Sequence, residues 1–275
     1  MDDMQQRVRV SVTGGVADVR LDRAGKLNAL DRAMLAALVS AGRQLALDSG
    51  VRAVVLSGNG RAFSAGLDFA EFRAMTADGA GPVPSPGDDD GYTGPARALA
   101  QRAAYIWAEL PVPVIAAVHG VAFGGGLQIT LGADIRLAAP DAQLSVMEIR
   151  WGLVPDMTGS QLLPELVGRD VAKELTFTGR VLSGQEAAGL GLVTRTCQDP
   201  RGEALTLAAQ IAGQSPQAIR AAKALLDLAG RVSLHDGFAA EQDIIHRLIA
   251  SPDQVEAVRA NLEGRAPVFG EPAPG

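Results

Sequence analysis

An unbroken apolar run at residues 112–118 is the feature that most constrains the fold of this chain. Prolines lie at its start and His119 and Gly120 follow it, so its length suits a single strand. The run lacks the polar and apolar alternation of a half-exposed strand, and this is typical of a strand buried on both faces of a parallel sheet. It therefore predicts an α/β protein.

The flanking sequence predicts that strands alternate with helices. Period-2 alternation across residues 8–21, interrupted by a glycine pair, indicates a β-hairpin. Asp31 can cap a helix over residues 34–45, and residues 51–56 form a short β-branched run. After the central run, residues 124–138 indicate a glycine-rich turn, a helix and another strand.

The strand patterns stop near residue 200, and four helical patterns follow. We therefore expect a strand-and-helix core at residues 1–200 and a helical region at residues 201–275. Residues 78–94 are rich in Gly, Pro, Ser and Asp and have no apolar period, which predicts a surface loop.

Composition excludes several classes of protein. Of the 275 residues, 47% are hydrophobic and 20% are charged, which argues against a disordered chain or a coiled-coil rod. The net charge is −6 and no basic stripe is present, so we expect no nucleic-acid partner.

Cysteine usage and hydropathy bear on cofactors and location. Cys197 is the only cysteine, so the chain has no intrachain disulfide and no multi-cysteine metal site. The three histidines are scattered, and we expect no metal. The N-terminal residues do not resemble a signal peptide, and no run reaches the ~18 apolar residues of a membrane span. These observations predict a cytoplasmic protein with no membrane partner.

Two glycine-containing turns are the strongest candidates for a functional site. Residues 62–68 and residues 120–127 each follow a strand pattern and precede a helical one. Each turn can therefore present free backbone N–H groups at a helix N-terminus, and together they can form an oxyanion hole. The alternative is that the glycines only permit tight turns and close packing.

The pattern of several motifs resembles the crotonase family, also called the enoyl-CoA hydratase/isomerase superfamily. The resemblance rests on residues 26–30, 63–68, 120–126 and 148–155, and it extends over nearly the whole chain. It implies a superhelix of ββα units with a C-terminal α-helical trimerisation region. It also implies an acyl-CoA thioester as substrate and self-association to a trimer or a hexamer. Coenzyme A would be part of the substrate, and no other cofactor is expected.

The resemblance assigns roles to several residues. The backbone N–H groups of Leu67 and Gly125 would donate to the thioester carbonyl oxygen, where negative charge accumulates when an enolate forms. Gly25, Lys26 and Ala65 would lie against the coenzyme A part of the substrate. The alternative for Lys26 is an exposed, solubilising lysine.

One position departs from the hydratase pattern. Hydratases of the family use two glutamates to hold and activate water, and Gln128 occupies the first of these positions. An amide can orient water but cannot exchange a proton at neutral pH. Glu148 occupies the second position and is our candidate base; the alternative is a surface glutamate paired with Arg150.

Asp156 indicates a different branch of the family. The dienoyl-CoA isomerases place a glutamate and an aspartate at the positions of Glu148 and Asp156, although they carry an aspartate where this chain has Gln128. We therefore expect double-bond shifts in an enoyl- or dienoyl-CoA, with Asp156 as proton donor. Asp156 could equally start a turn after Pro155. The open alternatives are hydration of a 2-enoyl-CoA by Glu148 alone and a catalytically weak acyl-CoA-binding protein.

Overall fold

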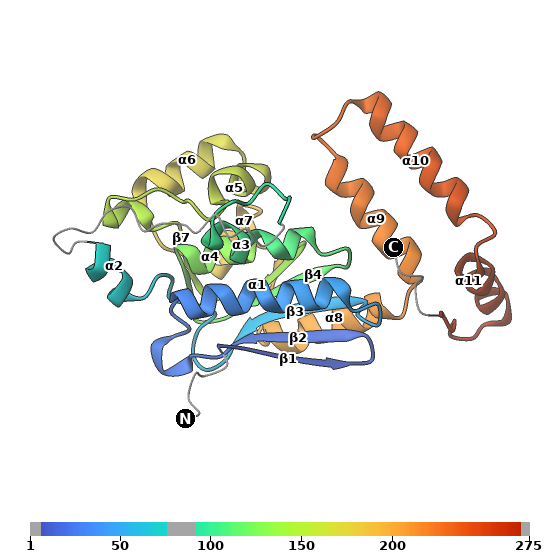
Figure 1. The fold of residues 1–275 in the computed structure, drawn as a ribbon, viewed down its shortest axis with the longest axis horizontal. Coiled ribbons are helices and arrows are strands. Elements are labelled where there is room, and N and C mark those ends of the chain that lie inside the picture. The colour runs from blue at the N-terminus through green and yellow to red at the C-terminus, as the bar shows by residue number, and fades with distance from the viewer. Residues whose placement is uncertain (1–6, 76–91, 271–275) are drawn as a thin grey trace.

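The computed structural model describes residues 7–75 and 92–270 as one α/β core with a helical extension (Figure 1). Six strands form the main sheet in the order β1-β2-β3-β4-β6-β9, and three form a second sheet in the order β5-β7-β8. The bounds of the strands are β1 Val8–Thr13, β2 Val16–Leu21, β3 Ala53–Gly58, β4 Val114–Val118, β5 Val121–Phe123, β6 Ile135–Ala138, β7 Gln143–Ser145, β8 Leu182–Ser183 and β9 Arg195–Thr196.

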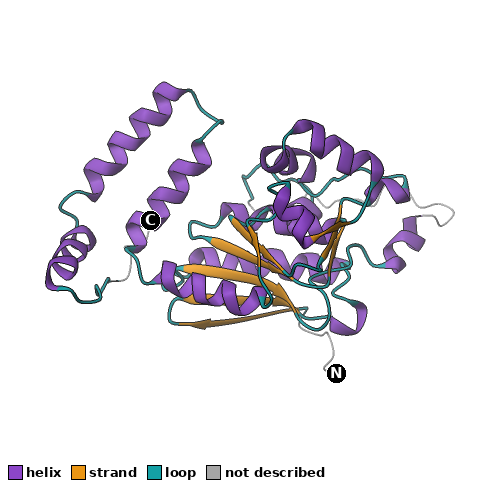
Figure 2. Ribbon diagram, turned by 180° about the vertical axis from the view of Figure 1, so that it is seen from behind, coloured by secondary structure: helices purple, strands orange, loops and turns teal. Residues whose placement is uncertain are grey.

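Helices cover both sheets and form the C-terminal part of the described chain. Figure 2 shows strands layered between helices, with further helices extending to one side of the core. The bounds of the helices are α1 Arg32–Leu47, α2 Phe69–Met75, α3 Leu99–Glu109, α4 Gly125–Leu131, α5 Gly159–Val167, α6 Arg169–Thr178, α7 Gly184–Gly189, α8 Pro200–Ala212, α9 Pro216–Leu228, α10 Leu234–Leu248 and α11 Pro252–Glu263. Two short 3-10 helices, η1 Ala24–Lys26 and η2 Glu148–Trp151, lie near the glycine turns and after β7.

The central apolar run forms β4, as predicted. Strand β4 pairs in parallel with β3 and β6, and all its residues are buried. Val114 and Ala116 belong to the larger core cluster, together with residues of α1 and α3. Ile115 and Ala117 belong to a second cluster with Ala204 and other small residues of α8. Alternate side chains therefore pack on opposite faces of the sheet, which explains why the run contains no polar residue.

The other expected elements are also present. Strands β1 and β2 pair antiparallel around Gly14 and Gly15, both of which have positive φ. The side chain of Asp31 accepts a hydrogen bond from the amide of Met34 and caps α1. Most of the loop expected at residues 78–94 lies outside the described residues.

The four predicted C-terminal helices are α8 to α11, and they divide into two groups. Helix α8 packs against β2, β3, β4 and β6, so it belongs to the sheet core in space. Helices α9 to α11 extend away from the sheet (Figure 1). The boundary at residue 200 stays a prediction. None of the described helices is long and apolar enough to cross a membrane.

Lys223 fastens the extension to the core. Its buried ammonium donates to the carbonyl of Val112, over 3.1 Å, and to Oδ2 of Asp134, over 2.9 Å. The same oxygen of Asp134 accepts the backbone amide of Val114, over 2.7 Å. One cation thus links α9 to the start of β4 and to the residue before β6.

We expect Lys223→Met to lower the free energy of unfolding by about 1–3 kcal/mol, because the Asp134 carboxylate and the Val112 carbonyl lose a charged donor. Urea denaturation of both proteins measures this difference. Lys173→Met, at an exposed lysine of α6, is the matched control and should change stability by less than about 0.5 kcal/mol. Equal stability of Lys223→Met and the unmodified protein would contradict this role of Lys223.

Candidate active site

The two glycine turns predicted from the sequence lie against each other. Ser64 pairs in parallel with Ala122, and the amide of Phe123 donates to the carbonyl of Ser64 over 3.1 Å. A Cβ placed on Gly66 would lie 2.6 Å from the carbonyl oxygen of Phe123 and 3.8 Å from the amide nitrogen of Gly125. Gly66 also has a φ of 84°. Only glycine fits this close backbone approach at this φ.

The amides of Leu67 and Gly125 remain available in this arrangement. The isolated bridge between Leu30 and Leu67 engages the carbonyl of Gly66 and the amide of Asp68, on either side of the Leu67 amide. Gly125 is the first residue of α4, whose first-turn amides have no intrahelical acceptor. Within the described ranges, neither Leu67 nor Gly125 donates its amide to a backbone carbonyl.

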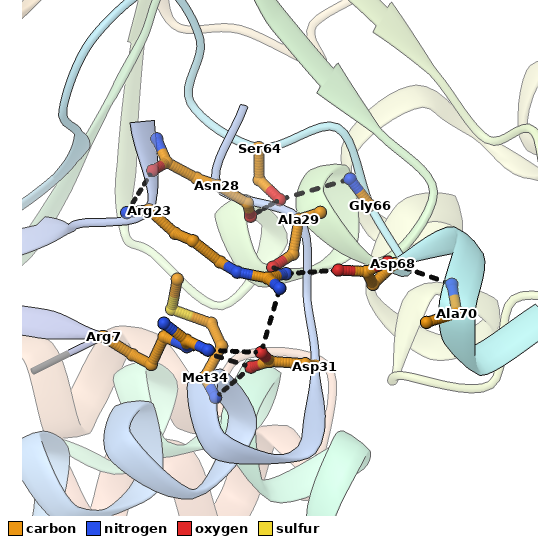
Figure 3. A network of polar contacts seen from close by, with 10 residues as sticks. All are labelled: Arg7, Arg23, Asn28, Ala29, Asp31, Met34, Ser64, Gly66, Asp68 and Ala70. Carbon is orange, nitrogen blue, oxygen red and sulfur yellow. Dashed lines mark hydrogen bonds and ion pairs between the residues drawn. The ribbon is translucent and has the colours of Figure 1, made fainter. Parts of the chain in front are cut away.

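A network of charged side chains stabilises the turn at residues 62–68 (Figure 3). The guanidinium of Arg23 binds Asp68 and, at 3.4 Å, Asp31, and it also donates to the carbonyl of Ala29. The carboxylate of Asp68 accepts the amide of Ala70 at the start of α2. This hydrogen bond and the Arg23 guanidinium keep the pKa of Asp68 below its usual value. Asp68 is thus an ionised capping residue.

Asn28 and Ser64 fix the same turn through the backbone. The fully buried Asn28 amide donates to the carbonyls of Asn59, Ala62 and Phe63, at 2.8–3.1 Å. The hydroxyl of Ser64 donates to the Asn28 carbonyl and accepts the amide of Gly66 (Figure 3). These contacts determine where the next amide, that of Leu67, points.

The three residues expected to contact coenzyme A lie close together. Gly25 and Lys26 are exposed residues of η1, which ends beside Leu27. The amide of Ala65 donates to the carbonyl of Leu27 over 2.9 Å. An exposed cation and an accessible loop therefore lie next to the first glycine turn.

Glu148 and Gln128 form the polar centre of the site. Nε2 of Gln128 donates to Oε1 of Glu148 over 2.6 Å, and both side chains are buried. Oε2 of Glu148 is buried too, and within the described part of the chain no hydrogen-bond partner reaches it. The alternative reading, in which Glu148 pairs with Arg150 at the surface, is not met: no such pair occurs among the ion pairs of the described residues, and Glu148 is buried.

Burial governs the protonation of both candidate carboxyls. Desolvation raises the pKa of Glu148, its own backbone amide and Gln128 lower it, and the charge of Asp156 raises it further. Asp156 lies in the loop before α5 and is accessible to solvent, yet its surroundings desolvate the carboxyl enough to raise its pKa. The two carboxyls are close enough for one charge to affect the other.

Aromatic side chains gather around Trp151, the last residue of the 3-10 helix that begins with Glu148. Phe72 of α2 stacks on Trp151, at the end of η2, with ring centroids 4.4 Å apart. Phe69 meets the edge of Trp151 at 5.8 Å. Phe69 and Trp151 are 67% and 46% exposed, so they present apolar surface to solvent. An acyl chain could cover this surface.

Sequence reasoning assigned no role to Arg23 or to Ser64. Neither residue belongs to a periodic pattern, because each acts through partners that are distant in sequence. A sequence signal for this part of the site was Asn28, which lies in a motif of the resemblance at residues 26–30.

Comparisons with known proteins identify the family. The family model described as enoyl-CoA hydratase/isomerase matches residues 11–272. A probable enoyl-CoA hydratase of Bacillus subtilis is 36% identical over 248 residues, which cover 88% of this chain and 90% of the relative. The mitochondrial methylglutaconyl-CoA hydratase of Mus musculus is 33% identical over 275 residues, which cover 98% of this chain and 83% of the relative.

A solved structure agrees with this result. The enoyl-CoA hydratase of Bacillus anthracis superimposes with a TM-score of 0.86 at 32% identity, over 97% of this chain and all of the other. The fold is therefore the crotonase fold that the sequence predicted. The chain belongs to the enoyl-CoA hydratase/isomerase family of the crotonase superfamily.

Proposed function

We propose that this acyl-CoA enzyme shifts double bonds in an enoyl- or dienoyl-CoA, with Glu148 as base and Asp156 as proton donor. The observation that carries the proposal is the buried carboxyl of Glu148. Its Oε2 has no hydrogen-bond partner among the described residues, and the charge of Asp156 raises its pKa. Gln128 supplies an amide where the two-glutamate hydration reaction needs a second carboxylate.

The reaction balances with these two groups. Glu148 takes a proton from the carbon next to the thioester of a 3,5-dienoyl-CoA, and the electron pair moves to the thioester oxygen. The amides of Leu67 and Gly125 donate to that oxygen. The pair then returns as Asp156 delivers a proton to the far end of the diene, which leaves a 2,4-dienoyl-CoA. Proton exchange with solvent restores both carboxyls, so no cofactor is consumed.

Hydration of a 2-enoyl-CoA is the second candidate, because both relatives described above carry hydratase names. In that reaction Glu148 acts alone. Purified protein offered a 3,5-dienoyl-CoA, a 3-enoyl-CoA and a 2-enoyl-CoA separates the candidates, since conjugation changes the absorbance and hydration gives a distinct product. Conjugation supports the isomerase, whereas hydrated product without conjugation supports the hydratase. Binding without turnover of any of the three supports a weakly active acyl-CoA-binding protein.

Replacing either carboxyl should reduce the rate of isomerisation and leave the affinity for acyl-CoA nearly unchanged. We expect Glu148→Gln and Asp156→Asn each to lower kcat by about 10²–10⁴, since each removes a proton-transfer group. The dissociation constant of the acyl-CoA should stay within about threefold, because binding depends on the glycine turns and the coenzyme A contacts. Asp141→Asn, at an exposed aspartate outside the site, is the matched control. Unchanged kcat in Asp156→Asn would remove that residue from the reaction.

The activity should depend on pH through both carboxyls. Glu148 must be ionised to act as base, so kcat/KM should fall as the pH drops through its raised pKa. Asp156 must be protonated to act as donor, so kcat/KM should also fall as the pH rises through its raised pKa. The result is a bell-shaped profile whose alkaline limb disappears in Asp156→Asn. The apparent pKa values of the two limbs describe the coupled pair of carboxyls and not either residue alone. A profile flat from pH 5 to pH 9 would contradict this assignment.

We also propose that the C-terminal helices associate with other copies of the chain and that the protein is cytoplasmic. Helices α10 and α11 expose a row of large apolar side chains, which is unusual for a surface that faces only water. These side chains are Leu234, Phe238, Ile245, Ile249, Val255, Val258 and Leu262. The proposed partners are copies of the same chain in a trimer or a hexamer.

Phe238→Glu should shift the protein towards the monomer, because it places a charge where an apolar contact between subunits would form. Light scattering coupled to size-exclusion chromatography measures the mass of the assembly. Glu241→Gln, at an exposed position of the same helix, is the control and should leave the mass unchanged. The same mass for Phe238→Glu and the unmodified protein would show that Phe238 lies outside the interface.

A further inference from the structure

The side chain of Gln128 has contacts that hydration chemistry does not explain. Gln128 is 1% exposed and projects from α4. Its Oε1 accepts the backbone amides of Met157 and Gly159, both over 2.9 Å, while its Nε2 donates to Oε1 of Glu148 over 2.6 Å. One amide group therefore connects the base to the segment that follows Asp156.

The backbone of that segment is shaped around the Gln128 oxygen. Thr158, between the two donating amides, has a φ of 77°, in the left-handed region that non-glycine residues rarely adopt. This conformation turns the amides of Met157 and Gly159 towards one acceptor, as in the backbone nests that bind anions. The hydroxyl of Thr158 is buried, and no partner for it is present among the described residues. Its side chain thus gives no hydrogen bond that would explain the strained conformation, whereas the Gln128 oxygen does.

The packing around Gln128 is equally specific. A Cβ placed on Gly159 would lie 2.7 Å from Oε1 of Gln128 and 3.0 Å from its Cδ, so glycine is needed for the amide to fit. Both lone pairs of Oε1 are used by backbone donors, which leaves this oxygen no capacity to accept a hydrogen bond from water. The structure thus favours a role for Gln128 in fixing protein groups.

A side-chain amide makes all three contacts at neutral pH, whereas an ionised carboxylate does not. A carboxylate at this position could accept the amides of Met157 and Gly159, but it could not donate to Glu148. At neutral pH it would instead place a second negative charge beside Oε1 of Glu148. A thioether could do neither.

We propose that Gln128 is a positioning residue that fixes Glu148 relative to the loop carrying Asp156. Its Nε2 orients Glu148 so that the free Oε2 is the reactive oxygen, and its Oε1 holds the backbone of residues 157–159. The catalytic consequence rests on the proposed function, in which Glu148 and Asp156 transfer protons. The groups that affect Glu148 are Gln128 from α4, Asp156 from the loop and the backbone of Glu148 itself.

The test compares Gln128→Glu, Gln128→Met and the control Gln161→Met, which changes an exposed glutamine of α5. Infrared difference spectra against Glu148→Gln report the titration of the Glu148 carboxyl. Hydrogen–deuterium exchange of a peptide containing residues 157–159 reports the backbone contacts. Neither measurement needs turnover, so the outcome is separable from that of the proposed reaction.

The two variants should separate the hydrogen bond from Gln128 to Glu148 from the two hydrogen bonds that Gln128 accepts from the backbone of residues 157–159. In Gln128→Met the midpoint of Glu148 should rise by about one pH unit, because a hydrogen bond to the ionised carboxylate is lost, and exchange at residues 157–159 should become faster. In Gln128→Glu the midpoint should also rise, while slow exchange persists because the two acceptor oxygens remain. The control should match the unmodified protein in both measurements.

Kinetics add a third readout if the enzyme isomerises dienoyl-CoA. The acid limb of the kcat/KM profile should move to higher pH in Gln128→Glu, with KM within about threefold of the original value. Faster exchange with an unchanged Glu148 midpoint in Gln128→Met would overturn the proposal, since Gln128 would then be only structural. An unchanged midpoint in both variants would overturn it as well. A shifted midpoint in a protein that turns over none of the three substrates would uphold the positioning of Glu148 and reject the proposed reaction.

Discussion

Close contact between two glycine turns is the constraint on which the site depends. The turn at residues 62–68 follows β3, and the turn at residues 120–127 contains β5. The amide of Phe123 donates to the carbonyl of Ser64 and the amide of Ser64 donates to the carbonyl of Val121, and these hydrogen bonds hold the two turns together. Side chains are excluded from this contact, because a Cβ on Gly66 would overlap the carbonyl of Phe123. The backbone is thereby fixed where the amides of Leu67 and Gly125 donate to no backbone carbonyl of the described residues. Such preorganised donors stabilise a developing oxyanion without reorganising during the reaction.

A buried carboxyl next to these amides completes the chemistry. Taking Glu148 out of water disfavours its charged form, and one hydrogen bond from Gln128 offsets only part of that penalty. The remaining instability makes the carboxylate a stronger base than an exposed glutamate. Arg23 acts differently, because its ion pairs with Asp68 and Asp31 hold the turn in place and help to lower the pKa of Asp68. Similar residue types therefore have opposite roles because their surroundings differ.

Much of the fold was predictable from the sequence, whereas the contacts within the site were not. The apolar run of β4 predicts burial on both faces, and the capping residue Asp31 predicts the start of α1, since both signals are local. The motifs at residues 63–68 and 120–126 pointed to the family and to Leu67 and Gly125 as candidates, and the segment that begins at residue 148 pointed to Glu148 and Asp156. The contacts of Gln128 with residues 157–159 join segments about thirty positions apart. They depend on the left-handed conformation of Thr158, which no residue preference predicts.

A crystal structure with an unreactive acyl-CoA analogue bound would test the central idea most directly. We expect the thioester carbonyl oxygen to lie about 2.7–3.1 Å from the amide nitrogens of both Leu67 and Gly125, the distance at which such donors stabilise an oxyanion. The acyl carbons should then lie beside Oε2 of Glu148. A bound thioester whose oxygen contacts neither amide would contradict the role of the two turns and with it the assignment of Glu148 as the base.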